Sequence, residues 1–192
     1  MRSSFNLHVD HSALLVVDMQ RYFCDKDSDA QVPQVDKTIS KIKKLIDFFS
    51  ENRRPIVFTR HIDSNESDNM MLKWWSENIR EEDPMSELIS DFETSRGEVL
   101  IKHQYDAFFN TDLESYLKDK GVKQVLICGV LTNLCCETTA RSAFMRGFEV
   151  YFATDATATF KQDMHKATLL NLSYGFATLV TVNDVLCIKG KT

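Results

Sequence analysis

Short apolar runs rich in β-branched residues alternate along this chain with longer segments of helical periodicity, and this alternation restricts the possible fold more than any other feature. Six runs are expected to form strands, at residues 13–17, 56–59, 99–101, 125–130, 149–153 and 177–182. Helices are expected between them at 35–50, 111–119, 133–146 and 162–174, with short helices in the polar stretch 61–97. We therefore predict a single α/β domain over residues 1–192, with a three-layer, doubly wound, mostly parallel six-stranded sheet and helices on both faces.

Composition and charge argue against several classes of function. The chain carries 23 Lys+Arg against 28 Asp+Glu, a formal net charge of −5 with no basic run, so no nucleic-acid partner is expected. Its six glycines are too far apart for a dinucleotide-binding or P-loop motif, and we expect no cofactor. No run approaches the length of a membrane span or a secretory signal, and the five cysteines are odd in number. We expect a cytoplasmic protein with free thiols and no membrane partner.

Three reactive side chains are expected at one edge of the predicted sheet. Asp18 ends the first strand, Lys102 ends the third, and Cys135 lies just beyond the fourth, in the first turn of a helix that Thr132 or Asn133 could cap. Ligands of open parallel sheets bind outside the carboxyl ends of the strands. Each residue type alone has a commoner structural role, as a loop acid, a surface lysine or a buried thiol. Their joint placement is what indicates a reactive site.

Two adjacent cysteines compete for the role of the reactive thiol. On the predicted helix, Cys136 shares a stripe with Ala140 and Ala143, a small apolar face suited to packing on the sheet. Cys135 shares a polar stripe with Thr139, so it is the better candidate for a thiol in a cleft. We expect the helix N-terminus and the nearby lysine to lower the pKa of this thiol and to favour the thiolate.

Three stretches make the chain resemble the isochorismatase-like cysteine hydrolases, which include nicotinamidases, N-carbamoylsarcosine amidohydrolases and ureidoacrylate-type amidases. The stretches are Leu14–Gln20, then Lys102 with Tyr105–Phe108 and Thr111–Leu113, and then Gly129–Ala140. The resemblance extends from residue 14 to about residue 186. It implies a catalytic triad of Asp18, Lys102 and Cys135, and so selects the same cysteine as the helix stripe does.

The resemblance also implies how such a triad would work. Asp18 would take the proton of the Cys135 thiol, which would attack a carbonyl carbon, while Lys102 offsets the clustered negative charge. A cis peptide bond between Val130 and Leu131 is implied, and it would direct the N–H groups of Leu131 and Cys135 at the developing oxyanion. The expected activity is hydrolysis of a small amide or carbamoyl substrate through a thioester. The family also implies a homo-oligomer, a dimer or a tetramer.

One departure from the family pattern concerns metal binding. Nicotinamidases carry an Asp-x-His metal pair after the second strand, whereas this chain has His61 and Asp63 at the corresponding positions and no matching downstream histidine. We therefore expect no metal site and interpret these two residues as a solvated loop pair, with weak metal binding by the pair as the open alternative.

Substrate choice is expected to depend on the polar stretch 61–97 and on aromatic residues near the triad. The segment Met71–Trp75 is similar to a substrate-side loop of true isochorismatases, although a packed helix or a subunit contact would explain it equally well. Vinyl-ether hydrolysis and a non-catalytic binding protein of the same fold therefore stay open beside the amidase interpretation. The residues expected to contact the substrate, for which core packing is the alternative, are Gln20, Phe23, Trp74, Tyr105 and Phe109.

Overall fold

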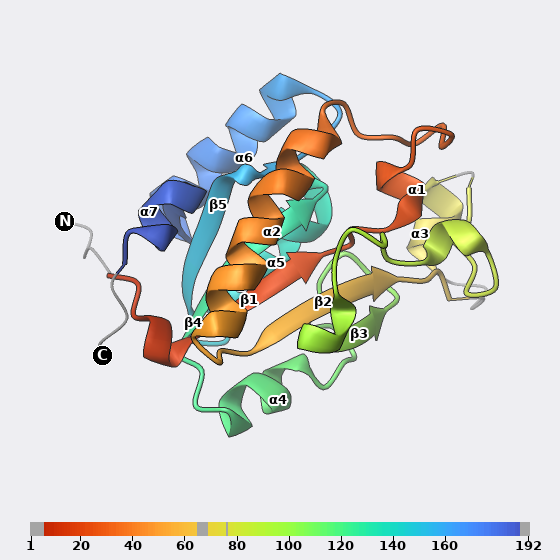
Figure 1. The fold of residues 1–192 in the computed structure, drawn as a ribbon. Helices are drawn as coiled ribbons and strands as arrows, with labels where there is room; N and C mark the ends of the chain where they lie inside the picture. Colours follow the sequence, from red (N-terminus) through yellow and green to blue (C-terminus); the bar gives the residue numbers. More distant parts are fainter. Residues whose placement is uncertain (1–5, 65–68, 76, 189–192) are drawn as a thin grey trace.

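The computed structural model describes residues 6–64, 69–75 and 77–188 and contains a single six-stranded sheet in that part of the chain (Figure 1). Every neighbouring pair of strands is parallel, so the predicted fold class is confirmed and the sheet is wholly rather than mostly parallel. The strands lie side by side in the order β3 (Glu98–Lys102), β2 (Ile56–His61), β1 (Ser12–Val17), β4 (Gln124–Val130), β5 (Glu149–Ala158) and β6 (Thr178–Val180).

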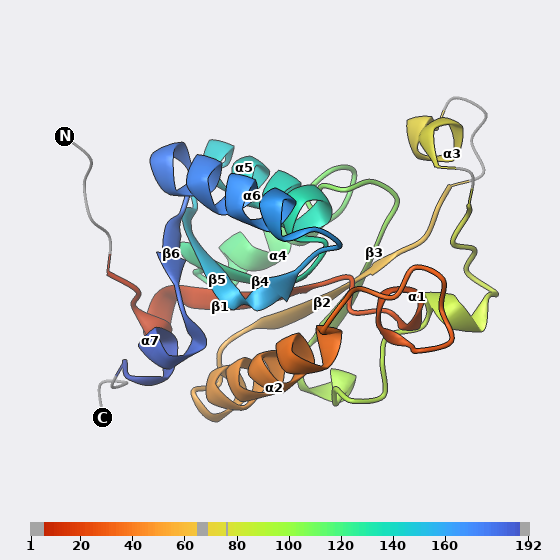
Figure 2. The ribbon, with the colours of Figure 1, turned by 90° about the horizontal axis from the view of Figure 1, so that it is seen from above.

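Helices cover both faces of the sheet, as expected (Figure 2). One face carries α2 (Val35–Glu51) and α7 (Val182–Leu186), and the other carries α4 (Leu113–Asp119), α5 (Glu137–Met145) and α6 (Gln162–Gly175). Two further short helices, α1 (Arg21–Cys24) and α3 (Met70–Trp74), lie beyond the carboxyl ends of the strands. Neither α1 nor α7 is predicted from the sequence, because four or five residues are too few to establish a helical period. No helix of the described residues is long and apolar enough to cross a membrane.

The central strand β1 shows why residues 13–17 form a continuous apolar run. All six of its residues are buried. Leu14 and Val16 belong to the hydrophobic core beneath α2, while Ala13, Leu15 and Val17 belong to the core beneath α4, α5 and α6. Side chains alternate between the two faces of a strand, so a strand covered on both faces needs an apolar residue at every position.

The sheet reverses its winding direction between β1 and β4, and the chain there comes unusually close to itself. Gly129 pairs with Val17 in the register and has a φ of 117°. A Cβ atom at Gly129 would lie 2.1 Å from the Val17 carbonyl oxygen, so only glycine fits. The last residues of β1 and β4 are thereby held together at the topological switch point, where ligands of such sheets bind.

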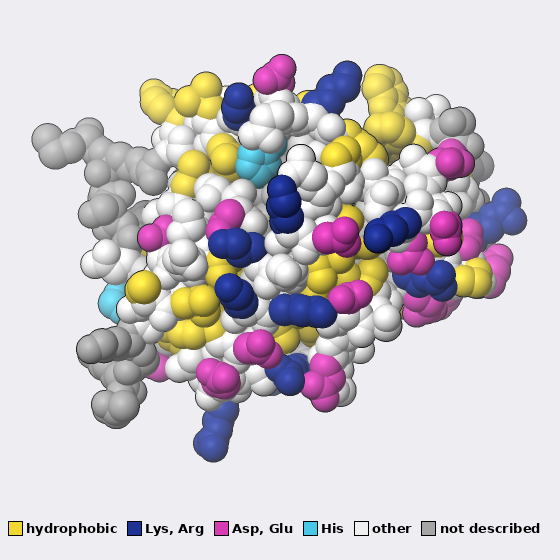
Figure 3. All heavy atoms as spheres, turned by 45° about the horizontal axis from the view of Figure 1, so that its top comes forward, with side chains coloured by type: hydrophobic (Ala, Val, Ile, Leu, Met, Phe, Trp, Pro, Cys, Tyr) yellow, Lys and Arg dark blue, Asp and Glu magenta, His cyan; other side chains and the backbone are white. Residues whose placement is uncertain are grey.

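The molecular surface carries charges of both signs. On the face drawn in Figure 3, Lys and Arg side chains are interspersed with Asp and Glu side chains. This mixture is consistent with the modest formal net charge of −5.

Candidate active site

Asp18, Lys102 and Cys135 meet at the carboxyl edge of the sheet, as their positions in the sequence predict. The Lys102 Nζ lies 2.8 Å from the Asp18 Oδ2 and 3.6 Å from the Cys135 Sγ. The side chains of Asp18 and Lys102 are completely buried, and Cys135 is 7% exposed. The three groups therefore form one desolvated cluster of acid, cation and thiol.

Backbone and side-chain hydrogen bonds hold this cluster in place. Asp18 follows β1 with a φ of 48°, a left-handed conformation that aspartate tolerates better than most residues. The Thr59 hydroxyl donates to the Asp18 Oδ1 at 2.6 Å and accepts the Asp18 N–H at 3.0 Å. Lys102 donates a further hydrogen bond to the Gln104 carbonyl at 2.9 Å. Thr59 was not singled out in the sequence, although a hydroxyl at the end of the apolar run 56–59 is the signal that could have identified it.

The expected lowering of the Cys135 pKa is wrong. Burial raises the pKa of the Cys135 thiol well above its usual range, and the negative charge of Asp18 raises it further, against the smaller opposite effect of Lys102. Burial by itself would lower the pKa of Lys102, but Asp18 and then Cys135 outweigh it and raise that pKa. The resting site thus favours a protonated thiol beside an Asp18–Lys102 ion pair.

The start of the helix that carries Cys135 also differs from the expectation. Cys135 lies in a π-helical turn, Thr132–Cys136, that precedes α5, and no side chain caps either segment. The Thr132 hydroxyl instead pairs with the His165 Nδ1 at 3.0 Å, and the Asn133 Oδ1 accepts from Thr159 at 2.6 Å. The expectation that Thr132 or Asn133 caps the helix is therefore wrong, because both side chains are committed to tertiary contacts.

Alkylation of Cys135 by iodoacetamide is expected to keep accelerating as the pH rises beyond about 8.5, the ordinary cysteine pKa. The raised pKa keeps the thiol protonated at lower pH, and only the thiolate reacts. Peptide mass mapping at a series of pH values measures the rate, with the exposed Cys187 as an internal control for the reagent. A rate for Cys135 that levels off near neutral pH would show instead that the resting site holds a thiolate.

The structure separates Cys135 from Cys136 as the helix stripes predict. Cys135 lines a cavity, whereas Cys136 is fully buried in the apolar core with Ala140 and Ala143. The peptide bond between Val130 and Leu131 is cis, as the resemblance implies, and Leu131 lines the same cavity as Cys135. An oxyanion-binding role for their N–H groups stays a prediction.

The cavity above the triad has a volume of about 340 Å³ and is mainly aromatic and acidic. Among the described residues that line it there is no lysine or arginine. Its aromatic residues are Tyr22, Phe23, Trp75, Tyr105 and Phe160. Its carboxylates are Asp29, Asp63 and Glu77. The remaining residues are Ala30, His61, Met71, Ile79, Leu131, Leu134 and Cys135. A volume of this size suits a small molecule.

Two of the five residues expected to contact substrate line this cavity, namely Phe23 and Tyr105. The other three lie elsewhere. Gln20 is fully buried beneath the site, where its amide donates to the His61 carbonyl and accepts the His61 N–H. Trp74 is 75% exposed and Phe109 is 51% exposed, and neither contributes to the cavity wall. The short helix α3 and the loop after Phe108 turn these rings toward solvent.

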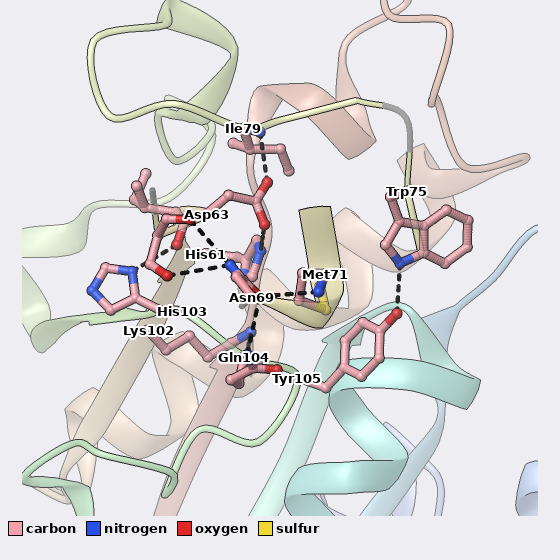
Figure 4. Close-up of polar contacts among 12 residues, drawn as sticks. His61, Asp63, Asn69, Met71, Trp75, Ile79, Lys102, His103, Gln104 and Tyr105 are labelled. Atoms are coloured by element: carbon pink, nitrogen blue, oxygen red, sulfur yellow. Dashed lines mark hydrogen bonds and ion pairs between the residues drawn. The ribbon is translucent and has the colours of Figure 1, made fainter. Parts of the chain in front are cut away.

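The tryptophan of the cavity is Trp75, which the sequence does not distinguish from its neighbour. Trp75 follows the last residue of α3, and its indole N–H donates to the Tyr105 hydroxyl at 2.6 Å (Figure 4). Glu77 accepts a hydrogen bond from the Tyr22 hydroxyl. The polar stretch 61–97 therefore does supply part of the cavity wall, as expected.

The two tryptophans provide a matched pair of variants. Trp75→Ala is expected to lower kcat/KM for a small amide by roughly tenfold to a hundredfold, because it removes an aromatic wall and the hydrogen bond to Tyr105. Trp74→Ala, which removes a largely exposed ring, should stay within about twofold of wild type. Steady-state kinetics of both variants measure kcat/KM. A larger loss in Trp74→Ala than in Trp75→Ala would contradict the assignment of Trp75 to the cavity wall.

Comparison with known proteins agrees with the fold and with the family resemblance. The model of the isochorismatase domain matches residues 12–184. The chain is 42% identical over 174 residues to Nicotinamidase 3 of Arabidopsis thaliana, covering 88% of this chain and 84% of that protein. A cysteine hydrolase structure from Pseudomonas syringae pv. phaseolicola 1448A superposes with a TM-score of 0.88 at 26% identity, covering 95% and 94% of the two chains. A pyrazinamidase of Pyrococcus horikoshii in complex with zinc has a TM-score of 0.80 at 31% identity, covering 89% and 99%.

These similarities define the class of the protein as a hydrolase built on a parallel sheet with helices around it. The chain belongs to the isochorismatase family.

The interpretation of His61 and Asp63 as a solvated pair is wrong, because both are buried, at 4% and 9% exposed. A zinc ion nevertheless does not fit this pair. Both oxygens of Asp63 are already engaged, by the His61 Nε2 at 3.1 Å and the Ile79 N–H at 2.7 Å. Within the described residues, no group of three or more His, Cys, Asp or Glu side chains could hold a metal ion.

Proposed function

We propose that this protein is a cysteine-dependent hydrolase of a small amide or carbamoyl substrate, acting through a thioester. The observation that carries the proposal is the buried contact of Lys102 with both Asp18 and Cys135 at the cavity. Nucleophilic catalysis by a thiol needs a base beside it, and desolvation strengthens the electrostatic coupling between them.

The protonation states favour proton transfer during attack rather than before it. The raised pKa keeps the proton on the Cys135 sulfur, so Asp18 removes it as the sulfur attacks the carbonyl carbon. The N–H groups of Leu131 and Cys135 would hold the resulting oxyanion. Asp18 returns the proton to the leaving amine as the C–N bond breaks. It then takes a proton from the water that hydrolyses the thioester, which restores the thiol.

Lys102 would serve as a positioning residue in this sequence. Its ammonium orients Asp18 and stays close to the negative charge as that charge passes from the carboxylate to the sulfur and the oxyanion. A fully buried cation is retained there because the carboxylate is equally buried.

The acidic cavity favours amide hydrolysis over the alternative, vinyl-ether hydrolysis of isochorismate. Isochorismate carries two carboxylates, whereas the described cavity lining presents Asp29, Asp63 and Glu77 and no lysine or arginine. A dianion would meet like charge in a poorly solvated space. A neutral or cationic amide meets no such barrier.

The test is a substrate panel with ammonia release and isochorismate consumption as separate readouts. The wild-type protein is incubated with small aromatic and aliphatic amides, carbamoyl compounds and isochorismate. Ammonia release from at least one amide or carbamoyl compound supports the proposal. Consumption of isochorismate with no ammonia release from any other compound would refute amide hydrolysis and establish vinyl-ether hydrolysis as the activity.

A further inference from the structure

The most unusual polar group in the cavity that the proposed reaction does not use is the imidazole of His61. His61 ends β2 and pairs in the register with Lys102 of β3, so it stands next to the triad. Its ring lines the cavity together with the Asp63 carboxylate, and only 4% of the residue is exposed. Figure 4 shows the pair between Ile79 on one side and Lys102 on the other.

The hydrogen bonds around Asp63 determine which nitrogen of His61 carries the proton. Burial would raise the pKa of Asp63, but hydrogen bonds from His61 and the Ile79 N–H outweigh it and lower that pKa. An ionised carboxylate can only accept, so the His61 Nε2, 3.1 Å from the Asp63 Oδ1, must donate. In the neutral imidazole the proton is then on Nε2, and Nδ1 presents a lone pair.

This lone pair has no partner among the described residues. The Nδ1 atom of His61 is buried without a hydrogen bond. The Gln20 side chain holds the N–H and the carbonyl of His61 at 2.8 and 2.9 Å, which fixes the backbone. The ring itself is held by the contact of its Nε2 with the Asp63 Oδ1 at 3.1 Å. Leaving a buried acceptor unpaired is unfavourable, so this nitrogen has unused capacity for a hydrogen bond from a ligand.

We propose that the Asp63–His61 pair is a metal-free, hydrogen-bond-accepting subsite of the catalytic cavity. It accepts an N–H or O–H of the substrate, separate from the carbonyl that Cys135 attacks. This inference rests on the proposed function for the identity of the ligand as a small amide. It makes Gln20 a positioning residue, which acts through the backbone of His61.

Two amides of almost the same shape isolate this hydrogen bond. 1H-Pyrrole-3-carboxamide carries a ring N–H donor, whereas furan-3-carboxamide carries a ring oxygen that can only accept. Binding is measured by calorimetry on the Cys135→Ala protein, which cannot form a thioester, at about pH 8, where an ordinary imidazole is neutral. The pyrrole amide is expected to bind at least about tenfold more tightly, because the furan oxygen would face a buried acceptor.

Adding Asp63→Asn should reverse this preference. The Ile79 N–H needs an acceptor at residue 63, so it holds the oxygen of the new amide and turns the amide N–H₂ toward His61. The His61 Nε2 must then accept, the proton moves to Nδ1, and the subsite becomes a donor that suits the furan oxygen. Adding His61→Phe instead should remove the preference altogether.

The outcomes separate this inference from the proposed function. Equal binding of the two amides to Cys135→Ala, or no binding of either, would overturn the subsite, and this comparison does not depend on whether the double variants fold. A loss of binding in EDTA that zinc restores would overturn its metal-free character. A clear preference for the pyrrole amide, with no ammonia release by the wild-type protein, would leave the subsite in place and refute the amidase.

Discussion

Replacing Cys135 by alanine is expected to abolish ammonia release from every amide that the wild-type protein hydrolyses, with a loss of about 10⁴-fold or more in kcat. The sulfur is the only atom proposed to bond to the substrate, and alanine has no group to replace it. The remaining hydrogen bonds of the cavity should still bind the substrate, so its Kd should change far less than kcat. Single-turnover assays and calorimetry on the same preparation measure both quantities.

Cys136→Ala is the matched control for this substitution. Cys136 is equally buried but belongs to the apolar core rather than to the cavity. Removing its sulfur should reduce the free energy of unfolding by about 1 kcal/mol and leave kcat within about threefold of wild type. If Cys135→Ala keeps wild-type turnover, or if Cys136→Ala alone loses it, the thioester mechanism through Cys135 is refuted.

Lys102→Met is expected to lower the free energy of unfolding by about 3–5 kcal/mol and to abolish turnover. The methionine fills a similar volume but leaves Asp18 as an uncompensated charge in a fully buried position, where Lys102 now lies 2.8 Å from it. The Thr59 hydroxyl and the backbone cannot replace that cation. Urea denaturation followed by circular dichroism measures the stability loss.

A second variant distinguishes the unpaired charge from a simple loss of packing. Adding Asp18→Asn to Lys102→Met removes the orphaned charge and should recover part of the lost stability, although not the activity. If the double variant is no more stable than Lys102→Met, the loss comes from packing and not from the buried carboxylate. A loss below about 1 kcal/mol in the single variant would mean that water reaches Asp18.

Much of the fold could be predicted because its signals are local in the sequence. The continuous apolar run at 13–17 identifies a strand covered on both faces, and the structure has β1 there with every residue buried. Parallel strands bring their carboxyl ends to one edge, so the order of the elements was enough to place Asp18, Lys102 and Cys135 together. Helices of four or five residues, such as α1 and α7, carry no comparable signal.

What could not be predicted depends on contacts between segments far apart in the chain. Trp74 and Trp75 are adjacent and chemically identical, and only the position of Tyr105, thirty residues away, decides which ring closes the cavity. In the sequence, His61 and Asp63 have the pattern of a polar loop pair. In the structure, the Ile79 N–H donates to Asp63 and the Gln20 side chain accepts the His61 N–H. The Cys135 pKa rises because burial and Asp18 together outweigh Lys102, a balance that no local pattern records.

The sequence by itself determined the parallel sheet, the alternation of its strands with the longer helices along the chain, and the three residues that meet at its edge. These follow from side-chain periodicity and from the handedness of chain connections, which act over short stretches of chain. Only the tertiary structure decided the protonation of the thiol, the walls of the cavity and the unpaired nitrogen of His61. Solvent exclusion and the availability of hydrogen-bond partners are properties of the packed molecule, because they depend on every segment that comes to lie around a group.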